Sequence, residues 1–236
     1  MGLYCAIMAI NPDDFPPGSY HELPLFPLNN VVLFPGMPLP LHIFEERYKA
    51  MIGSCIDRDE PFGVLLIREG NEVGDPAEPH SIGTTARVSQ VQRLQEGRLN
   101  ILTRGENRFE LLETVRTVPH LVGLVRYIED TEGEVSSTTV AGVREQYIQL
   151  QRTLTAMAGG WDREISVPDE AIALARIACA TLAVSLPLPP DVRQSLLETL
   201  TAGGQLEKLL TLMRQANRIV AEQVEQNTPF KGPRLN

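Results

Sequence analysis

The sequence has few lysines, few cysteines and no long apolar run, and each shortage removes a class of protein. Lysine supplies only 3 of the 21 basic residues, and the formal net charge is -9, so the chain lacks the basic tract that binds nucleic acid. The three cysteines, Cys5, Cys55 and Cys179, form no Cys-x-x-Cys pair, which is evidence against a zinc ribbon or a disulfide framework. No stretch approaches the roughly 20 apolar residues of a transmembrane helix. We therefore expect a cytoplasmic protein without a membrane or nucleic-acid partner.

The amino-terminal segment also lacks a targeting signal. Its apolar run, MGLYCAIMAI, has no positive residue before it, as a secretory signal would require. Residues 1–20 end in FPPGSY, which fits neither a helix nor a central strand, so we expect an extended lead-in. Met8 is an alternative start site, and the intact mass of the native protein would distinguish it from Met1.

Short apolar runs separated by Gly, Pro, Asn and Asp indicate a β-rich domain over residues 21–132. Pro35-Gly36 has the composition of a type II turn, and the acidic segment Glu69–His80 is expected to be a surface loop. Pro40 would suit an edge strand, because proline donates no N–H. The spacing predicts eight strands: Glu22–Phe26, Val31–Phe34, Leu39–Ile43, Phe62–Arg68, Ile82–Gln92, Arg98–Arg104, Arg108–Val118 and Val122–Tyr127.

One helix, over Phe44–Ile56, is expected to interrupt these strands. Glu45 and Lys49 are spaced for an i,i+4 ion pair on its outer side. The apolar residues of the segment recur at the spacing of a single buried helix face: Phe44, Tyr48, Met51, Ile52 and Cys55.

The hydrophobic period changes from 2 to 3.6 near residues 130–137, where we place a domain boundary. Residues 138–227 are predicted to form a helical bundle, and residues 228–236 a tail. The second helix, with Ser166 as its expected N-cap, is apolar on nearly every side and should lie at the buried centre. The expected fold class is thus α+β: a twisted β pseudo-barrel with one helix, then a bundle. Its predicted helices are 139–158, 168–184, 191–200 and 205–225.

Motifs for nucleotide binding and for hydrolysis are missing from the sequence. It contains neither GxxxxGK[ST] nor G-x-S-x-G, and its lysines fall at expected solvent-facing positions or in the tail. The best catalytic candidate, His42 with Glu45 and Glu46, lacks the second His of HExxH or HxxEH. Acidic residues that complement a helix dipole are the simpler interpretation of this segment. We therefore predict no enzymatic activity, no metal and no cofactor.

The most informative stretch is residues 22–52, ELPLFPLNNVVLFPGMPLPLHIFEERYKAMI. Its segments PLFP, LFPG and LPLHIFE, followed by Arg47 and Tyr48, resemble the start of the amino-terminal, substrate-binding domain of Lon proteases. The segments IGT (82–84) and GENRF (105–109) resemble later strands of that family, and residues 186–198 resemble its helical closing part.

The resemblance covers about residues 22–224 and implies a PUA-like pseudo-barrel followed by a helical bundle. The ATPase and peptidase modules of Lon have no counterpart before Asn236. We therefore expect a stand-alone relative that does not share the proteolytic activity.

The resemblance also implies a role in polypeptide recognition. The leading hypothesis is a module that binds unfolded or extended segments in proteolysis or quality control, with a protease or chaperone as a further partner. Binding would use an exposed apolar groove or a free sheet edge. Most motif residues are Pro, Gly or large apolar types, so shaping the fold is the simpler role for them. Candidate binding residues within the motifs are Phe34, Met37, Leu39, His42, Tyr48 and Phe109.

The sequence leaves other functions and the oligomeric state open. The alternative from a different class is a structural, oligomerisation or scaffold protein that docks a specific folded partner. An apolar patch on the C-terminal helices, rather than on the β-domain, would favour it. A hydrolase with an unrecognised site is a third hypothesis, which inactivity on broad peptide and ester panels would exclude. RNA binding is opposed by the net charge of -9.

Overall fold

The structure is a computed structural model that describes residues 20–70, 78–160 and 164–227, without the side chains of 225–227. The chain forms two compact units. The first contains the residues up to Glu129 together with Pro187–Glu198, and the second contains Asp130–Leu186 and the residues from Thr199 onward. Residues 187–198 therefore belong to the first unit, although they lie within the 138–227 range of the expected bundle.

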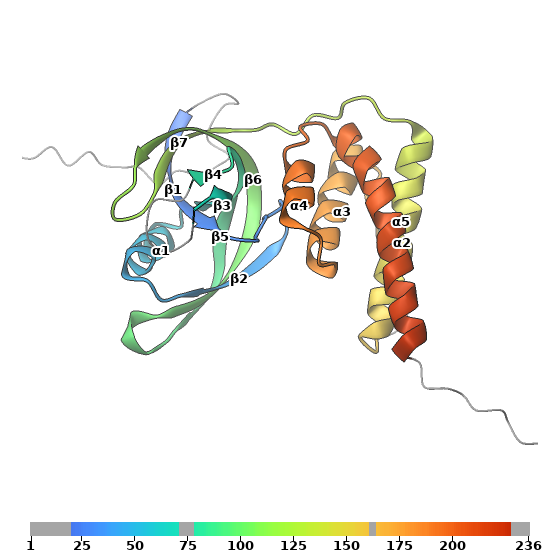
Figure 1. The fold of residues 1–236 in the computed structure, drawn as a ribbon, viewed down its shortest axis with the longest axis horizontal. Coiled ribbons are helices and arrows are strands. Elements are labelled where there is room, and N and C mark those ends of the chain that lie inside the picture. The colour runs from blue at the N-terminus through green and yellow to red at the C-terminus, as the bar shows by residue number, and fades with distance from the viewer. Residues whose placement is uncertain (1–19, 71–77, 161–163, 228–236) are drawn as a thin grey trace, which may run out of the picture. The chain divides into compact units, whose positions relative to one another are not determined.

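The first unit is built on a sheet that closes on itself (Figure 1). The strand order is β1-β7-β6-β5-β3-β4, with β2 added to β6, and a parallel pairing of β1 with β3 joins the two sides. All other pairings are antiparallel. The strands are β1 (Tyr20–Leu28), β2 (Pro38–Ile43), β3 (Phe62–Glu69), β4 (Glu78–Pro79), β5 (Ile82–Arg93), β6 (Leu99–Arg116) and β7 (Val122–Tyr127).

The centre of this sheet encloses an apolar core. Its cluster of buried residues comes from strands distant in sequence, which explains why the sheet must close around it: Leu23, Leu25, Leu65, Phe109 and Val125. The α+β fold class and the pseudo-barrel expected from the sequence are therefore observed.

The predicted strand over Val31–Phe34 is absent. These residues form an irregular segment whose side chains from Val32 to Phe34 are buried. The predicted type II turn follows: Gly36 has a φ of 81°, and the Met37 N–H donates to the Phe34 carbonyl at 3.0 Å. The apolar run that suggested a strand is therefore a buried loop that enters this turn.

Two predicted strands, Arg98–Arg104 and Arg108–Val118, are one continuous strand, β6. Gly105 lies in the gap between the two predicted strands, and in the structure it allows a close approach. A Cβ at this position would lie 2.3 Å from the Phe34 carbonyl oxygen. The glycine therefore lets β6 pass directly beneath the buried loop.

The predicted helix begins two residues later than expected, as α1 (Glu46–Arg58). Tyr48, Met51, Ile52 and Cys55 lie on its buried face, as predicted. Phe44 does not: the backbone is extended at Glu45, and the Phe44 side chain is 57% exposed. The expected Glu45–Lys49 pair is also absent, since Lys49 pairs with Glu46 at 2.5 Å and Glu45 pairs with Arg47 at 2.9 Å.

Helix α4 (Pro190–Leu197) packs within the first unit and is held by three polar side chains. Buried Arg108 on β6 donates to the Leu197 carbonyl at 2.8 Å, at the end of the helix. Gln194 donates to the Ile82 carbonyl at 2.9 Å, and Arg193 donates to that of Asn30 at 2.6 Å. These bonds join α4 to backbone carbonyls of the loop after β1 and of β5, and give a partner to a carbonyl in the last turn of the helix.

The second unit contains three helices in its described residues: α2 (Ser137–Met157), α3 (Ala171–Ser185) and α5 (Ala202–Asn227). The predicted N-cap Ser166 is not used, because α3 begins later and Glu170 precedes it. Helix α3 is also less enclosed than its composition suggests. One side is buried, including Leu174, Ala178 and Leu182, but Val184 is largely exposed.

Candidate functional site

Five of the six candidate binding residues lie inside the first unit rather than on its surface. Phe34, Met37, Leu39, Tyr48 and Phe109 are all buried, and Phe109 belongs to the core cluster. The Tyr48 ring packs on Phe26 with ring centroids 4.2 Å apart. These large apolar side chains shape the fold. The sixth residue, His42, is exposed near the end of β2.

His42 is the first member of a hydrogen-bonded ladder that crosses three strands. The register aligns His42 on β2 with Asn100 on β6 and Gln92 on β5. His42 Nδ1 lies 2.7 Å from Asn100 Oδ1, and Asn100 Nδ2 donates to Gln92 Oε1 at 3.0 Å. An amide oxygen only accepts, so Nδ1 of His42 donates, and Nε2 of the neutral ring is left as an acceptor.

Phe44 completes this row with an apolar surface. Its ring stacks on the His42 ring at an interplanar angle of 24°, with centroids 6.0 Å apart. The ladder restrains the imidazole, and the imidazole supports the exposed phenyl ring. Aromatic side chains, Phe among them, are enriched at protein interfaces, so the restrained and exposed phenyl ring is a candidate anchor.

The ladder lies on an outward surface that we call the ladder face. Side chains alternate along β6, so Asn100, Leu102 and Arg104 point outward while Leu99, Ile101 and Thr103 are buried. The ladder face consists of Pro38, Pro40 and His42 from β2, Asn100, Leu102 and Arg104 from β6, and Gln90 and Gln92 from β5, and Phe44 adjoins it directly after β2.

The free edge of β2 is poorly suited to adding a further strand. Among the described strands β2 pairs only with β6, as its edge prolines suggested. The Met37 carbonyl accepts from the Gly105 N–H at 2.9 Å, so by alternation the backbone groups of Pro38, Pro40 and His42 face away from β6. Two of these three residues have no N–H. The edge therefore offers one backbone donor, which is how natural sheets block edge pairing.

A small cavity of about 110 Å³ lies between the α1 region and β5, where Cys55 and Glu60 meet Val88, Gln90 and Val91. Burial raises the pKa of the Cys55 thiol to about 12, with the Glu60 carboxylate adding to the effect. The thiol therefore stays protonated and behaves as an apolar group. The cavity therefore presents no reactive nucleophile.

The acidic residues beside His42 do not form a catalytic or metal cluster with it. His42 is bonded to Asn100, whereas Glu45 pairs with Arg47 and Glu46 with Lys49. Within the described ranges, no group of three or more His, Cys, Asp or Glu side chains could hold a metal ion.

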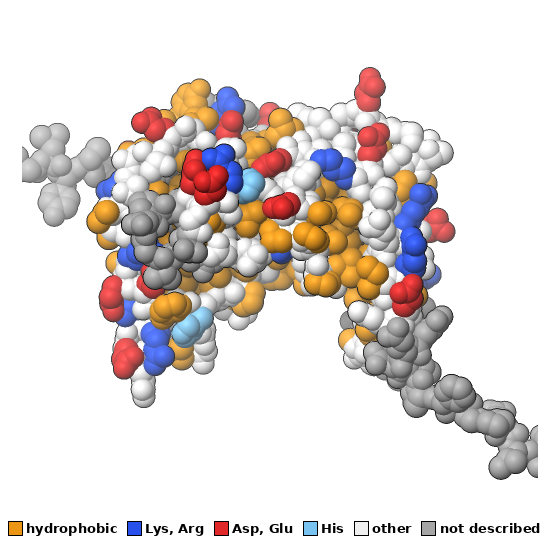
Figure 2. Space-filling model, viewed as in Figure 1, with side chains coloured by type: hydrophobic (Ala, Val, Ile, Leu, Met, Phe, Trp, Pro, Cys, Tyr) orange, Lys and Arg blue, Asp and Glu red, His pale blue; other side chains and the backbone are white. Residues whose placement is uncertain are grey.

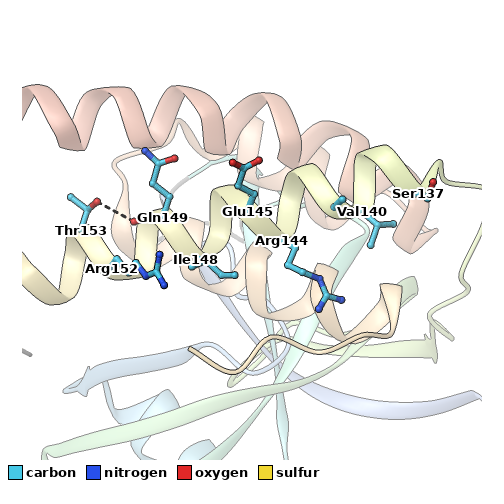
Figure 3. Close-up of a pocket in the computed structure, with 9 residues that line it drawn as sticks. Ser137, Val140, Arg144, Glu145, Ile148, Gln149, Arg152 and Thr153 are labelled. Atoms are coloured by element: carbon cyan, nitrogen blue, oxygen red, sulfur yellow. Dashed lines mark hydrogen bonds between the residues drawn. The ribbon is translucent and has the colours of Figure 1, made fainter. Parts of the chain in front are cut away.

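The second unit carries a larger groove, of about 890 Å³, along one helix (Figure 3). Figure 3 shows Arg144, Ile148 and Arg152 on one side of α2, with Glu145 and Gln149 on the other. Arg144 is already engaged, since it donates to Asp169 and to the Pro168 carbonyl at 2.9 Å each. The groove thus lacks a convergent set of groups that would fix a ligand.

Exposed apolar side chains occur on both units (Figure 2). The first unit has Phe44 and a group near the β6–β7 turn, and the second has Val184, Ile219 and others. Apolar surface therefore does not distinguish a docking role of the helices from a binding role of the β-rich unit. Among the described residues, no helix combines the length and hydropathy of a membrane span.

The family of the chain follows from a match to a family model. Residues 22–215 match the model of the ATP-dependent protease La (LON) substrate-binding domain. The chain belongs to this family. The match is to the substrate-binding domain of Lon and not to its ATPase or protease domain.

Curated relatives and solved structures agree with this assignment. Lon protease 2 from Myxococcus xanthus is 27% identical over 94% of this chain, and Lon protease from Paraburkholderia phytofirmans is 31% identical over 79%. The chain covers 26% and 23% of those two proteins, so it spans about a quarter of their length.

Among solved structures, a Lon N-terminal domain protein from Xanthomonas campestris has a TM-score of 0.60 at 29% identity, covering 81% of this chain and 98% of that one. The N-terminal domain of Mycobacterium avium complex Lon protease has a TM-score of 0.58 at 20% identity, which shows the shared fold, over 82% and 98%.

Sequence reasoning missed most of the ladder face. It assigned Phe44 to a buried helix face and did not single out Asn100, Gln92 or Arg104. The alternation within LNILTR signalled that Asn100 and Arg104 share an outward face. The alignment with Gln92 depends on strand register, which the sequence does not display.

Proposed function

We propose that this protein is a non-enzymatic polypeptide-recognition module that binds extended segments of unfolded chains on the ladder face. The observation that carries the proposal is the exposed Phe44 ring, stacked on an imidazole that the Asn100–Gln92 pair restrains. Membership of the Lon substrate-binding family supports a role in substrate recognition. The bound segment would then pass to a separate protease or chaperone.

The polar groups of the ladder match the chemistry of a peptide unit. Within the described residues, neither His42 Nε2 nor Gln92 Nε2 has a hydrogen-bond partner, and both belong to the same cross-strand row. The imidazole nitrogen accepts, and the amide nitrogen donates. A peptide group supplies one N–H and one C=O, so an extended segment crossing this row would satisfy both.

Recognition by side chains fits the structure better than strand addition. Strand addition requires a row of backbone donors and acceptors, and the prolines of β2 remove two outward donors. The adjoining Pro40–Leu102 pair instead supplies apolar surface next to the ladder. We therefore expect the bound segment to lie over the side chains of the ladder face, and not along the backbone edge of β2.

The test is fluorescence anisotropy with a permanently unfolded model polypeptide and the same polypeptide folded, without ATP. We expect micromolar binding to the unfolded form only. Phe44→Ser should weaken it about tenfold, which corresponds to about 1.4 kcal/mol. Asn100→Ala should weaken binding less, by about threefold, because the imidazole loses its hydrogen-bond partner and then occupies the observed position only part of the time.

The matched control is Val115→Ser, which removes an exposed apolar side chain outside the ladder face. Equal weakening by Val115→Ser and Phe44→Ser would indicate general stickiness and contradict a defined site. Absence of binding to either form of the polypeptide would favour the alternative, a scaffold that docks a folded partner.

A further inference from the structure

The ladder face carries one cation and no carboxylate among its eight residues. Arg104 is exposed at the end of the face opposite to Phe44 and makes no ion pair within the described residues. Its cross-strand neighbour Arg87 is already engaged, by Glu106 at 2.7 Å and by Asp59 at 3.2 Å. Arg104 is therefore the guanidinium of this face that is available to a ligand.

The strand geometry fixes how far this charge lies from the apolar anchor. Arg104 faces Pro38 of β2, which lies six residues before Phe44, and the pairing of β2 with β6 shows no register shift. At roughly 3.4 Å per residue, Arg104 and Phe44 are about 20 Å apart along the strand direction. An extended ligand that runs alongside the strands advances by the same amount per residue, so six of its residues span the distance.

The surroundings make this charge distinctive. The chain has a net charge of -9, so its overall field favours basic ligands. A guanidinium pairs with carboxylates through a planar fork of donors, and at short range it acts against that field. A preference for acid at one position, within a protein that generally attracts basic peptides, would therefore mark Arg104 as the cause.

We infer that the preferred ligand is an extended segment with an acidic side chain six residues from a large apolar residue, the apolar group on Phe44 and the carboxylate on Arg104. This inference rests on the proposed function, since it names the substrate class of the same face. The middle of the segment lies over Pro40 and Leu102, and the peptide group beside the apolar residue meets the ladder.

The test uses the full chain and three peptides that carry an uncharged fluorophore. The first has a central Phe with Glu six residues away on each side, which makes the peptide direction irrelevant. The second has Lys in place of both Glu. The third has the composition of the first, but its Glu residues adjoin the Phe.

At physiological salt, where the long-range field of the net charge is largely screened, we expect the first peptide to bind two- to fivefold more tightly than the other two, which is the usual strength of an exposed ion pair. Arg104→Gln should abolish this preference, and Arg104→Glu should reverse it towards the Lys peptide.

The control is Arg93→Glu, which changes the net charge by the same amount as Arg104→Glu. Arg93 is an exposed residue of β5 that pairs with Leu99, outside the ladder face. It should weaken the two Glu peptides slightly, strengthen the Lys peptide slightly, and leave the order of the three affinities unchanged. Thermal melts verify that the variants are folded.

The outcomes separate this inference from the proposed function. If Phe44→Ser weakens all three peptides but wild type does not distinguish them, the charge inference is wrong and the site stands. If Arg93→Glu reverses the preference as fully as Arg104→Glu, the effect belongs to the overall field, and the inference is also wrong. If no peptide binds wild type, the proposed function itself fails. Self-association that hides the face, detected by sedimentation, would assign the face to a second copy and overturn the inference.

Discussion

Arg108 is a buried cation whose guanidinium holds the last turn of α4 through the Leu197 carbonyl. A helix C-terminus concentrates unpaired carbonyls and partial negative charge, so a guanidinium there both donates hydrogen bonds and complements the dipole. The arginine of the GENRF motif therefore has a structural role that joins a strand to a helix 89 positions away in sequence.

Replacing Arg108 by Met keeps the length of the side chain and removes the donor. We expect the free energy of unfolding to fall by roughly 1–3 kcal/mol, because a buried carbonyl loses a charged partner. Urea denaturation measures the change. Arg93→Met, at an exposed arginine, is the control and should change stability by less than about 0.5 kcal/mol. Similar effects of the two substitutions would contradict this role.

Two buried acids make the stability depend on alkaline pH. Burial raises the pKa of Cys55 from 9.0 to about 12, and burial together with Glu106 raises that of Tyr127 from 10.0 to about 12. Above pH 9 the unfolded chain loses these protons first, so the folded chain binds more protons than the unfolded chain. Stability is therefore fully present below pH 9 and falls as the pH rises towards 12, by up to about 1.4 kcal/mol per pH unit for each group.

Urea unfolding at pH 8, 9, 10 and 11 tests this dependence. Cys55→Ala should flatten the decline between pH 9 and 10, whereas Tyr127→Phe should act only above pH 10. A stability that stays constant from pH 8 to 11 in the wild-type protein would show that these groups ionise alike in both states.

The sequence predicted only in part which of the candidate binding residues are exposed and which are buried. The motif residues Phe34, Leu39 and Phe109 are large and apolar, so the sequence marks them as important but not whether they bind ligand or fill the core. Burial answers that question, and it depends on strands far away in the chain. His42 is the exception, because a polar residue among apolar neighbours near a strand end tends to face water.

At the scale of elements, one glycine marks the place where the sequence predicted two strands and the structure has one. The sequence predicted β7 with its observed bounds, as well as four of the five residues expected on the buried face of α1. It divided β6 between Arg104 and Arg108. The glycine in that gap, Gly105, makes room for the carbonyl oxygen of Phe34, and the sequence does not show this contact. A close approach between distant segments leaves no periodic signal.

Gly105→Ala should therefore destabilise the protein by roughly 1–3 kcal/mol, since the added Cβ would lie 2.3 Å from a carbonyl oxygen of the backbone. Gly53→Ala is the matched control: it lies within α1, and nothing would approach its Cβ within 4 Å. It should raise stability by about 0.5–1 kcal/mol through helix propensity. Thermal and urea unfolding provide both values, and equal signs would contradict the distinction.

The edge prolines of β2 allow a prediction about association. Replacing Pro38 and Pro40 together by Thr restores two outward N–H groups on a strand whose outer edge is unpaired among the described strands. We expect sedimentation velocity to show concentration-dependent self-association of this variant beyond that of the wild type. The control is Gln90→Thr at an exposed position of β5, which adds no backbone N–H group because Gln90 already has one. Unchanged association of the double variant would mean that these prolines do not protect the edge.

At the scale of the whole molecule, the two units are interleaved in sequence. The chain leaves the first unit after Glu129, returns at Pro187 for α4, and leaves again after Glu198. The change of hydrophobic period near residue 130 indicated the first crossing. The return was not predictable, because α4 has the same helical period as its neighbours and its allocation depends on Arg108 and Gln194.

A fragment of residues 20–129 should therefore form an incomplete unit with a lowered melting temperature. Joining residues 187–198 to it through a flexible Gly/Ser linker should raise that temperature, because α4 regains its partners. A linked, scrambled α4 sequence is the control. If the fragment melts at the same temperature with and without the native α4 segment, that helix contributes nothing to the first unit.

The position of Leu197 also sets the order of events during synthesis. Arg108 leaves the ribosome 89 residues ahead of its partner. At translation rates of about 5–20 residues per second, the β-rich unit waits roughly 4–18 s for its final helix. During that interval the nascent chain already contains the sequence of α2 and α3. The surface that α4 later covers is therefore exposed to chaperones and to premature pairing for seconds in every round of synthesis.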